Sequence, residues 1–212
     1  MGRVLASRQK TSLYRPLVAF DFDGTLTCRD SFTAFLAWRF GSVRYGVGLM
    51  RLAPAALRYL VGRDRNRLKA AVVREFLTGE SRKDLARRAE RFAASQARRL
   101  LRPDAARFWK QWQRENARLV IVTASPEILV APFARGLGAE AVIGTRLVFS
   151  ASDLATGELE GPNCRGAEKA TRLREMFGDD VRLDAAYGDS DGDIAMLAMA
   201  DEAAMKVFGE RP

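Results

Sequence analysis

Residues 17–27 read Leu-Val-Ala-Phe-Asp-Phe-Asp-Gly-Thr-Leu-Thr, an apolar run that ends in two aspartates one residue apart. The run predicts a strand, which places Asp21 and Asp23 at its carboxyl end. Alternate residues of a strand point to opposite faces, so both acids can share one side only if the chain turns at once, as Gly24 permits. Two neighbouring carboxylates favour a hard cation such as Mg²⁺. Taken alone, the stretch would also fit an ordinary acidic turn.

Three more short motifs follow along the chain. Residues 120–125 read Val-Ile-Val-Thr-Ala-Ser, an apolar run that ends in hydroxyl residues. Lys169 closes the polar segment 161–169, and residues 188–193 read Gly-Asp-Ser-Asp-Gly-Asp after another apolar run. In this order, with three of the four at strand ends, the motifs resemble those of the haloacid dehalogenase superfamily. The resemblance extends from residue 17 to about residue 208.

Outside residues 28–103, strand patterns alternate with helical patterns. The expected strands are Leu17 to Phe22, Arg118 to Thr123, Ala141 to Val148, Leu183 to Tyr187 and Ala203 to Phe208. The expected helices are Ala105 to Glu115, Pro126 to Leu137, Gly166 to Phe177 and Ile194 to Ala200. This alternation predicts an α/β fold with a doubly wound parallel sheet, in which ligands bind beyond the carboxyl ends of the strands. Residues 151–161, with Thr156-Gly157-Glu158, predict a short hairpin.

Residues 28–103 interrupt the alternation, because they contain no good strand pattern and are rich in Arg, Ala and Leu. They predict four or five helices. The segment is similar to the helical cap of the phosphoserine-phosphatase-like branch of the superfamily, subfamily IB. We therefore expect a Rossmann-like core domain formed by residues 1–27 and 104–212, and an inserted all-helical cap domain formed by residues 28–103. Caps of this kind exclude water and supply substrate contacts.

The composition indicates an enzyme that works without histidine. The 212 residues include 2 cysteines and no histidine, which excludes Ser-His-Asp, Cys-His and phosphohistidine mechanisms. Cys28 and Cys164 are too few for a disulfide framework, so reduced thiols are expected. Apolar stretches fall short of the ~20 residues that span a bilayer, and the N-terminus lacks a signal-peptide pattern. We expect a cytoplasmic protein, with peripheral contact at the inner face of the membrane as a further possibility.

Positive charge is concentrated in the expected cap. Residues 28–103 contain 18 Lys and Arg against 6 Asp and Glu, a net charge of +12, whereas the whole chain carries +9. Such a domain attracts anions, whether substrate phosphates, an acidic membrane surface or nucleic acid. A solvated helical surface rich in arginine would give the same count. Nucleic acid is the least favoured partner, because the segment has no recognised nucleic-acid motif and no clear set of stacking aromatics.

Arginine recurs every seven residues from Arg44 to Arg65, with apolar residues in the intervals. Seven residues are nearly two helical turns, so these arginines would line one edge of an apolar surface. Gly46 and Gly48 argue against one continuous helix, and Pro54 predicts the start of a second. An arginine edge beside an apolar face is typical of a helix that lies on anionic lipid. The competing interpretation is an ordinary cap helix packed on its neighbours.

The resemblance implies a role for each motif residue. Asp21 is the expected nucleophile, which forms an aspartyl-phosphate, and Asp23 is the expected acid that protonates the leaving oxygen and then activates water. The expected phosphate-binding residues are Thr123, Ala124, Ser125 and Lys169. Of these, Lys169 would neutralise the developing charge, and the amides that follow Thr123 could face the phosphate. We also expect Ser125 to be the N-cap of a helix whose first residue is Pro126.

The resemblance also implies one Mg²⁺ ion. Its expected ligands are the Asp21 carboxylate, the backbone carbonyl of Asp23 and the Asp189 carboxylate. Asp193 is expected to support these ligands and to orient Lys169. The chain departs from the phosphoserine phosphatase pattern at Gly192, where those enzymes carry asparagine, and the role of Asp191 is left open.

The second acid of the first motif indicates a phosphate ester as the substrate. A halide leaves without a proton, so haloalkanoate dehalogenases do not need an acid at the position of Asp23. A phosphomutase remains an alternative. Asp30 stands where phosphoserine phosphatases have a glutamate that binds the substrate amine.

Asp30, which is shorter than that glutamate, and the apolar, arginine-rich residues 43–61 are closer in character to the bacterial phosphatidylglycerophosphatase C-like branch. The substrate of that branch is a membrane phospholipid precursor. We therefore expect a lipid phosphate such as phosphatidylglycerophosphate, with Asp30, Arg51 and Arg58 as candidate substrate contacts. Phosphoserine or another small soluble phosphate monoester is the alternative. A basic nucleic-acid-binding or regulatory protein with a vestigial core is a more remote one.

Overall fold

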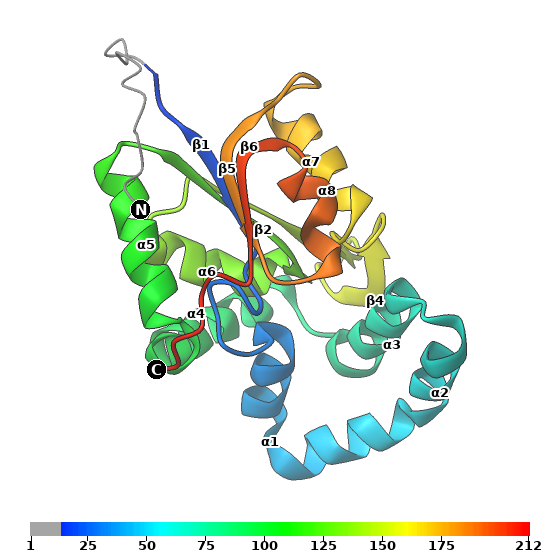
Figure 1. Cartoon of the computed structure of the whole chain (residues 1–212). Coiled ribbons are helices and arrows are strands. Elements are labelled where there is room, and N and C mark those ends of the chain that lie inside the picture. The colour runs from blue at the N-terminus through cyan, green and yellow to red at the C-terminus, as the bar shows by residue number, and fades with distance from the viewer. Residues whose placement is uncertain (1–13) are drawn as a thin grey trace.

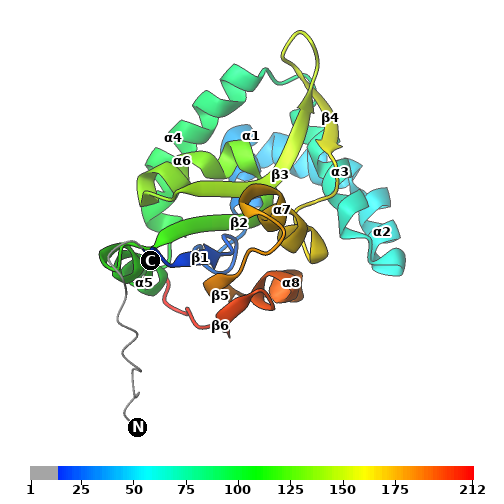
Figure 2. The same cartoon turned by 90° about the horizontal axis from the view of Figure 1, so that it is seen from above.

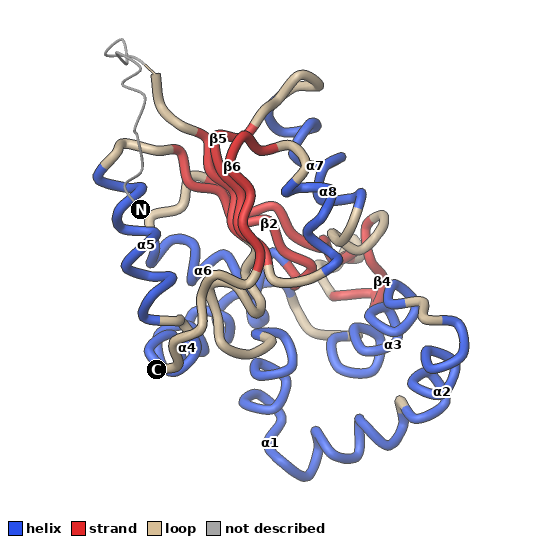
Figure 3. The backbone as a smooth tube through the Cα atoms, viewed as in Figure 1, coloured by secondary structure: helices blue, strands red, loops and turns tan. Residues whose placement is uncertain are grey.

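Six strands form one sheet in the order β4-β3-β2-β1-β5-β6 (Figures 1 and 3). The computed structural model describes residues 14–212. The strands are β1 (Leu17–Phe20), β2 (Arg118–Pro126), β3 (Ala141–Phe149), β4 (Ala155–Glu160), β5 (Leu183–Gly188) and β6 (Ala200–Met205). β1 pairs in parallel with both β2 and β5, and β4 runs antiparallel to β3 at one edge. The predicted α/β fold with a mostly parallel sheet is confirmed.

Helices cover both faces of this sheet (Figure 2). α5 (Pro103–Arg114) and α6 (Glu127–Leu137) lie on one face, and α7 (Ala167–Phe177) and α8 (Ile194–Leu197) lie on the other. The side chains of β1 alternate between them. Val18 and Phe20 pack in the cluster with α5 and α6, whereas Leu17 and Ala19 pack in the cluster with α7 and α8. All four are buried, as expected of a parallel strand with both faces covered.

The order of the strands reverses at β1. The chain passes from β1 to β2 and β3 on one side, and later to β5 and β6 on the other. In sheets of this kind, ligands bind beyond the carboxyl ends of the strands at the point of reversal. Asp21 follows the last residue of β1, and its amide donates to the Tyr187 carbonyl of β5 at 2.8 Å. The first motif therefore lies where the topology favours a ligand.

Four helices occupy the segment between β1 and α5. They are α1 (Ser31–Arg51), α2 (Ala53–Gly62), α3 (Arg65–Leu77) and α4 (Arg82–Leu100). Figure 1 shows α1, α2 and α3 beyond the carboxyl ends of the strands. α4 packs against α6, with the rings of Phe92 and Phe133 5.8 Å apart. We propose that these helices form the cap expected for residues 28–103, with an apolar interior that continues into one face of the sheet.

The break in the first cap helix lies at Gly41. Its φ of +69° is a conformation that glycine adopts without strain, and it separates a first half of α1 that buries one face from a largely exposed second half. The arginine repeat is not one continuous helix, as expected, but Gly46 and Gly48 themselves continue α1. A Cβ at Gly48 would overlap the Phe76 ring, so this glycine permits close packing of α1 on α3. Pro54 lies in the first turn of α2, as predicted.

The second half of α1 and the whole of α2 are largely exposed, and α2 contains no buried residue. The exposed large apolar side chains of this region are Val43, Leu49, Met50, Leu57, Leu60 and Val61. The arginine repeat extends over three helices, with Arg58 in α2 and Arg65 in α3. Arg44 and Arg51 both pair with Glu75 of α3, with nitrogen-oxygen distances of 2.9 and 3.5 Å. Within residues 14–212, every helix is too short or too polar to span a bilayer.

The hairpin turns at other residues than predicted, and its second strand is bonded to the end of α3. It is formed by β3 and β4 around residues 150–154, so Thr156-Gly157-Glu158 lies inside β4 rather than at a turn. Gly157 is needed because a Cβ there would overlap Thr78, the residue that follows α3. The amides of Gly79 and Ala155 donate to the carbonyls of Ala155 and Glu80, both at 2.8 Å. These backbone bonds fix the end of α3 to the sheet.

The bounds of α8 and β6 also differ from those predicted from the sequence. α8 ends at Leu197 rather than at Ala200, and β6 begins at Ala200, three residues earlier than predicted. The Leu183 amide donates to the Met199 carbonyl at 3.0 Å and Leu183 pairs with Ala200. Pairing with β5 therefore starts the strand where helical periodicity alone would continue the helix.

Candidate active site

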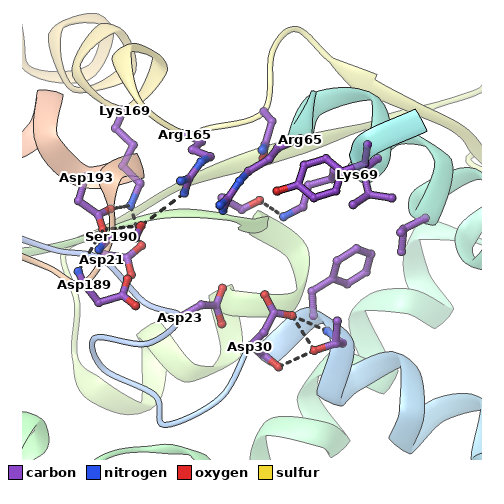
Figure 4. Close-up of a pocket in the computed structure, with 17 residues that line it drawn as sticks. Asp21, Asp23, Asp30, Arg65, Lys69, Arg165, Lys169, Asp189, Ser190 and Asp193 are labelled. Atoms are coloured by element: carbon purple, nitrogen blue, oxygen red, sulfur yellow. Dashed lines mark hydrogen bonds and ion pairs between the residues drawn. The ribbon is translucent and has the colours of Figure 1, made fainter. Parts of the chain in front are cut away.

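Lys169 lies among the acidic side chains of the first and fourth motifs. Its Nζ donates to Asp21 Oδ1, to Asp193 Oδ1 and to the Val122 carbonyl, each at 2.6 Å. The side chain comes from α7 and is buried. Thr25 Oγ1 donates to the other carboxylate oxygen of Asp21 at 3.1 Å. One ammonium group thus joins segments that are more than 100 residues apart in the chain (Figure 4).

Burial and neighbouring charges determine how these groups ionise. Burial raises the pKa of Asp21 to about 7, although the Lys169 ammonium opposes the shift. Burial also disfavours ionisation of Asp193, but Lys169 and two backbone amides outweigh it and lower the pKa of this carboxyl. The pKa of Lys169 is raised, because Asp21 and Asp193 outweigh its burial. In the metal-free protein, Asp21 is therefore the member of the group that titrates near neutral pH.

Asp23 is held by donors from the cap and from β2. Its Oδ1 accepts from the Ser31 amide at the start of α1, at 2.6 Å. Its Oδ2 accepts from the Ser125 hydroxyl at 2.6 Å and from the Thr123 hydroxyl at 3.4 Å. Burial and then the charge of Asp30 raise the pKa of Asp23, while the bonds from Ser125 and Ser31 oppose the shift. A carboxyl that is protonated more readily than usual is suited to proton donation.

Ser125 does not cap the next helix, so this prediction was wrong. β2 extends to Pro126, and α6 begins at Glu127 without a side-chain cap. The Ser125 hydroxyl donates to the Asp23 carboxylate instead, because an ionisable acceptor forms the stronger bond. The Ser125 amide donates to Thr123 Oγ1 at 3.0 Å. Ala124, between them, lines the pocket described below.

Asp189 and Gly24 lie beside Asp21. Carboxylate oxygens of Asp21, Asp189 and Asp193 lie within 4.8 Å of one another. Asp193 already accepts from Lys169 and from two backbone amides. Within residues 14–212 no donor is bonded to the Asp189 carboxylate, whose pKa is raised by burial and by Asp193. The Asp189 carboxylate lacks a donor among these residues and lies beside the Asp21 carboxylate, and such a pair of oxygen ligands fits Mg²⁺.

Gly24 allows this close approach of the first and fourth motifs. Its φ of +91° provides the immediate turn predicted after the strand. A Cβ at this position would overlap the Asp189 carboxylate. Any larger residue would therefore separate Asp189 from the turn that carries Asp21 and Asp23.

A pocket of about 470 Å³ opens over these acids, between the sheet and the cap (Figure 4). The cap contributes the apolar side chains of Phe32, Tyr59, Leu68 and Val72. Asp30 also lines the pocket, and its carboxylate caps α1 by accepting from the Thr33 amide at 2.7 Å. Arg51 and Arg58, the other candidate substrate contacts, are not among the residues that line it.

Three cations of the pocket were not predicted, namely Arg65, Lys69 and Arg165. Lys69 Nζ donates to the Ala124 carbonyl at 2.6 Å, and burial lowers the pKa of this lysine. Arg165 pairs with Asp191, which gives that acid a structural role. Arg65 ends the seven-residue arginine repeat, but that pattern indicated a lipid-facing edge rather than the pocket, and no sequence signal separates Lys69 from the other basic cap residues. Arg165 lies within the third motif, and this position could have identified it as a pocket residue.

Comparison with known proteins agrees with the motifs. The family model described as haloacid dehalogenase-like hydrolase matches residues 18–198. Protein CicA from Caulobacter vibrioides is 55% identical to this chain over 196 residues, which cover 92% of the chain and 88% of that protein. The similarity therefore includes both the sheet and the cap.

Solved structures share the fold at lower sequence identity. A protein with unknown function from Bordetella pertussis Tohama I superimposes with a TM-score of 0.76 at 23% identity, covering 89% of this chain and 88% of that one. A phosphoserine phosphatase, solved as an analogue of its phospho-aspartyl intermediate, gives a TM-score of 0.58 at 19% identity, covering 89% and 85%. At these identities the likeness concerns the fold.

Proposed function

This chain belongs to the haloacid dehalogenase-like hydrolase family, and we propose that it hydrolyses a phosphate monoester through a phosphoenzyme formed on Asp21. The arrangement of Lys169 carries the proposal, since its ammonium contacts Asp21 and Asp193 at 2.6 Å within a buried site. An acid two residues after the nucleophile, held by Ser125 and with a raised pKa, supplies the proton that an ester oxygen needs. Together these residues provide a nucleophile, an acid and a fixed positive charge.

The reaction then proceeds in two steps. A carboxylate oxygen of Asp21 attacks the phosphorus, the bond from phosphorus to the ester oxygen breaks, and Asp23 protonates that oxygen so that an alcohol leaves. Asp23, now ionised, takes a proton from a water molecule whose oxygen attacks the phosphorus of the phosphoenzyme. The bond to Asp21 breaks, inorganic phosphate leaves, and both carboxyl groups return to their starting states.

The residues around Asp21 hold the transferring group. We assign to Lys169 the neutralisation of its developing negative charge. The Thr123 hydroxyl bonds to Asp23 only at 3.4 Å, so its proton is available to a phosphate oxygen. The Ala124 amide is assigned to the same phosphoryl group, whereas Ser125 acts through Asp23, because its hydroxyl and its amide are both engaged.

Asp21, Asp189 and the backbone carbonyl of Asp23 would hold one Mg²⁺ ion. When bound, the ion supplies further neutralisation of the phosphoryl charge. Asp193 serves as a positioning residue, because it bonds both Lys169 and the Asp189 amide. Gly24 supports the same arrangement by admitting the Asp189 carboxylate beside the turn.

Magnesium is expected to raise the melting temperature of the protein, and more so as the pH rises from about 6 to about 8. Without metal, the pKa of Asp21 is about 7, above its unfolded value of 3.8, so the folded protein keeps a proton that the unfolded chain releases. Stability from this group is present at low pH and declines as the pH rises through about 7. Magnesium binds the ionised carboxylate and offsets that decline. Scanning fluorimetry with MgCl₂ or EDTA measures the effect.

The matched variants for this measurement are Asp189→Asn and Asp180→Asn. Asp180 is exposed in the loop that leads into the amino end of β5 and does not line the pocket. Asp189→Asn is expected to remove most of the magnesium-dependent shift, and Asp180→Asn to retain it. A full shift in Asp189→Asn would exclude Asp189 as a ligand.

For the substrate, we favour a lipid phosphate. The apolar wall of the pocket reaches Tyr59 of α2, and the same short helix exposes Leu57, Leu60 and Val61. A chain that leaves the pocket along this wall would meet an apolar surface on a domain with a net charge of +12. Exposed apolar side chains on a basic cap suit peripheral contact with an anionic membrane.

Asp30 favours the second candidate, a small soluble monoester such as phosphoserine. Its carboxylate lines the pocket next to Asp23, whose pKa it raises, and could meet a substrate amine. The bond from the Thr33 amide leaves carboxylate lone pairs for such a contact. The two candidates therefore differ in which cap feature meets the leaving group.

A substrate screen decides between them. We expect magnesium-dependent turnover of phosphatidylglycerophosphate in mixed micelles to exceed that of phosphoserine and the glycerol phosphates. We also expect the protein to co-sediment with anionic but not with zwitterionic vesicles, and less so as salt rises. Leu60→Gln with Val61→Gln should weaken both vesicle binding and lipid turnover while sparing p-nitrophenyl phosphate. Val207→Gln, at an exposed apolar position on the C-terminal segment, is the control.

The opposite pattern would establish the soluble alternative. Efficient phosphoserine turnover without vesicle binding at low salt would move the assignment to the small monoester. Absence of turnover on every monoester would remove the phosphatase proposal itself.

A further inference from the structure

The cap side of the pocket carries positive charge that the proposed hydrolysis does not use. Arg65 and Lys69 lie about one turn apart on α3 and line the pocket (Figure 4). Lys69 Nζ donates to a neutral acceptor, the Ala124 carbonyl, and lies 5.6 Å from the centre of the Phe32 ring. Among residues 14–212, no carboxylate lies within ion-pair distance of Lys69 or Arg65. Asp30 and Asp23 act on Lys69 only as more distant charges.

Arg165 reaches the same pocket from the loop before α7. Its guanidinium pairs with Asp191, and its Nη1 lies 3.4 Å from Ser190 Oγ. A Cβ at position 192 would overlap Arg165 Nη1, so Gly192 is the residue that leaves room for the guanidinium. The asparagine that phosphoserine phosphatases carry at this position would displace it.

Charges from both walls of the pocket act on Lys69 and on Asp191, the ion-pair partner of Arg165. Burial lowers the pKa of Lys69, the charges of Asp30 and Asp23 oppose the shift, and Arg165 adds a smaller lowering. The pKa of Asp191 is lowered by its bond to Arg165 and, to a smaller extent, by Arg65. Arg65 and Lys69 thus add positive charge to a pocket wall where neither forms an ion pair among residues 14–212, and a bound anion would supply the missing partner.

We infer that Arg165, Lys69 and Arg65 form a second anion site, which binds a second phosphate group on the alcohol portion of the substrate. The inference rests on the proposed phosphatase function, because the leaving group must extend from Asp23 toward the cap. A guanidinium and an ammonium beside each other are suited to a phosphate, which accepts several charge-assisted bonds. The substrate class is thus a phosphate monoester with a second phosphate, present either as a lipid phosphodiester or in a soluble bisphosphate.

Binding is measured by calorimetry in the Asp21→Asn background, which retains the pocket but lacks the nucleophile. We expect glycerol 1,3-bisphosphate to bind about tenfold or more tightly than glycerol 3-phosphate. Arg165→Gln or Lys69→Gln is expected to remove that preference. Arg67→Gln is the matched control, because Arg67 lies on the same helix but pairs with Asp64 outside the pocket. Equal affinity for the two ligands in the parent protein would overturn the inference.

A substitution at Gly192 tests whether the position of the Arg165 guanidinium matters, apart from its charge. Gly192→Asn is expected to lose the preference as Arg165→Gln does, because it displaces the guanidinium while every charge remains in the chain. Gly136→Ala on α6, where a Cβ meets nothing within 4 Å, is expected to keep it. An unchanged preference in Gly192→Asn would exclude Arg165 from the site. The melting temperature of each variant shows whether it is folded.

Turnover measurements identify whether the second phosphate belongs to a lipid headgroup or to a soluble compound. In the protein with Asp21 intact, faster turnover of phosphatidylglycerophosphate micelles than of glycerol 1,3-bisphosphate would assign the second phosphate to a lipid headgroup, and the reverse order to a soluble bisphosphate. Because the main readout is binding, loss of the phosphatase proposal would leave a measured preference for the bisphosphate intact. The failure of one can therefore be told from the failure of the other.

Discussion

Asp21→Asn is expected to lower phosphatase turnover by about 10⁴-fold or more, because the amide cannot form the phosphoenzyme. The fold should persist. Asparagine has the size of aspartate, its side-chain oxygen can still accept from Lys169, and Lys169 keeps its ion pair with Asp193. Replacement of a buried carboxylate whose pKa is raised to about 7 also removes a charge that burial disfavours. Steady-state turnover and the melting temperature are the two measurements.

Mass spectrometry of acid-quenched protein provides a direct check on the same residue. Wild type mixed with substrate should carry a phosphoryl group on the peptide that contains Asp21, and Asp21→Asn should not. Asp180→Asn, at an exposed position away from the pocket, should behave as wild type. Normal turnover by purified Asp21→Asn would falsify the assignment of the nucleophile.

Lys169→Met is expected to lower kcat by about 10²-fold or more and to destabilise the protein by about 3–5 kcal/mol. The ammonium is buried between two carboxylates, so its removal leaves Asp21 and Asp193 without their counter-charge. Without the attraction of Lys169, the pKa of Asp21 rises further above about 7, and less of the nucleophile is ionised at neutral pH. Kinetics and denaturant unfolding measure the two losses separately.

A double variant distinguishes catalysis from folding at this position. Lys169→Met with Asp193→Asn removes the positive charge together with one of its two partners, so part of the lost stability should return. Turnover should not return, because the transferring phosphoryl group still lacks the ammonium. Recovery of kcat along with stability would mean that Lys169 serves the fold alone. An increase in KM with unchanged kcat in the single variant would make it a substrate-binding residue.

The sheet and the four motifs could be located from the sequence because each motif follows, or lies just before, a strongly patterned element. Asp21 comes after an apolar run, and Lys169 lies in the first turn of a helix that follows a polar loop. Short-range patterns of this kind decide where strands end. The parallel order then brings the ends together, since Asp21 adjoins the Tyr187 carbonyl on the neighbouring strand.

The positions of the cap residues could not be predicted in the same way. The kink at Gly41 depends on how the first half of α1 packs, and the sequence offers Gly46 and Gly48 as equally plausible breaks. Lys69 enters the pocket because α3 is fixed by the hairpin, which is a contact between segments far apart in the chain. Ser125 bonds Asp23 for a similar reason. Tertiary contacts decided each of these cases against a reasonable local pattern.

The exposure of α2 has a consequence for how the enzyme can diversify. This helix buries no residue, yet Tyr59 on it forms part of the pocket wall. Substitutions on such a surface usually change the free energy of unfolding by less than about 0.5 kcal/mol. Descendants of this protein can therefore alter the wall that meets the leaving group at little cost to folding, while Asp21 and Lys169 stay in a buried site that tolerates few changes.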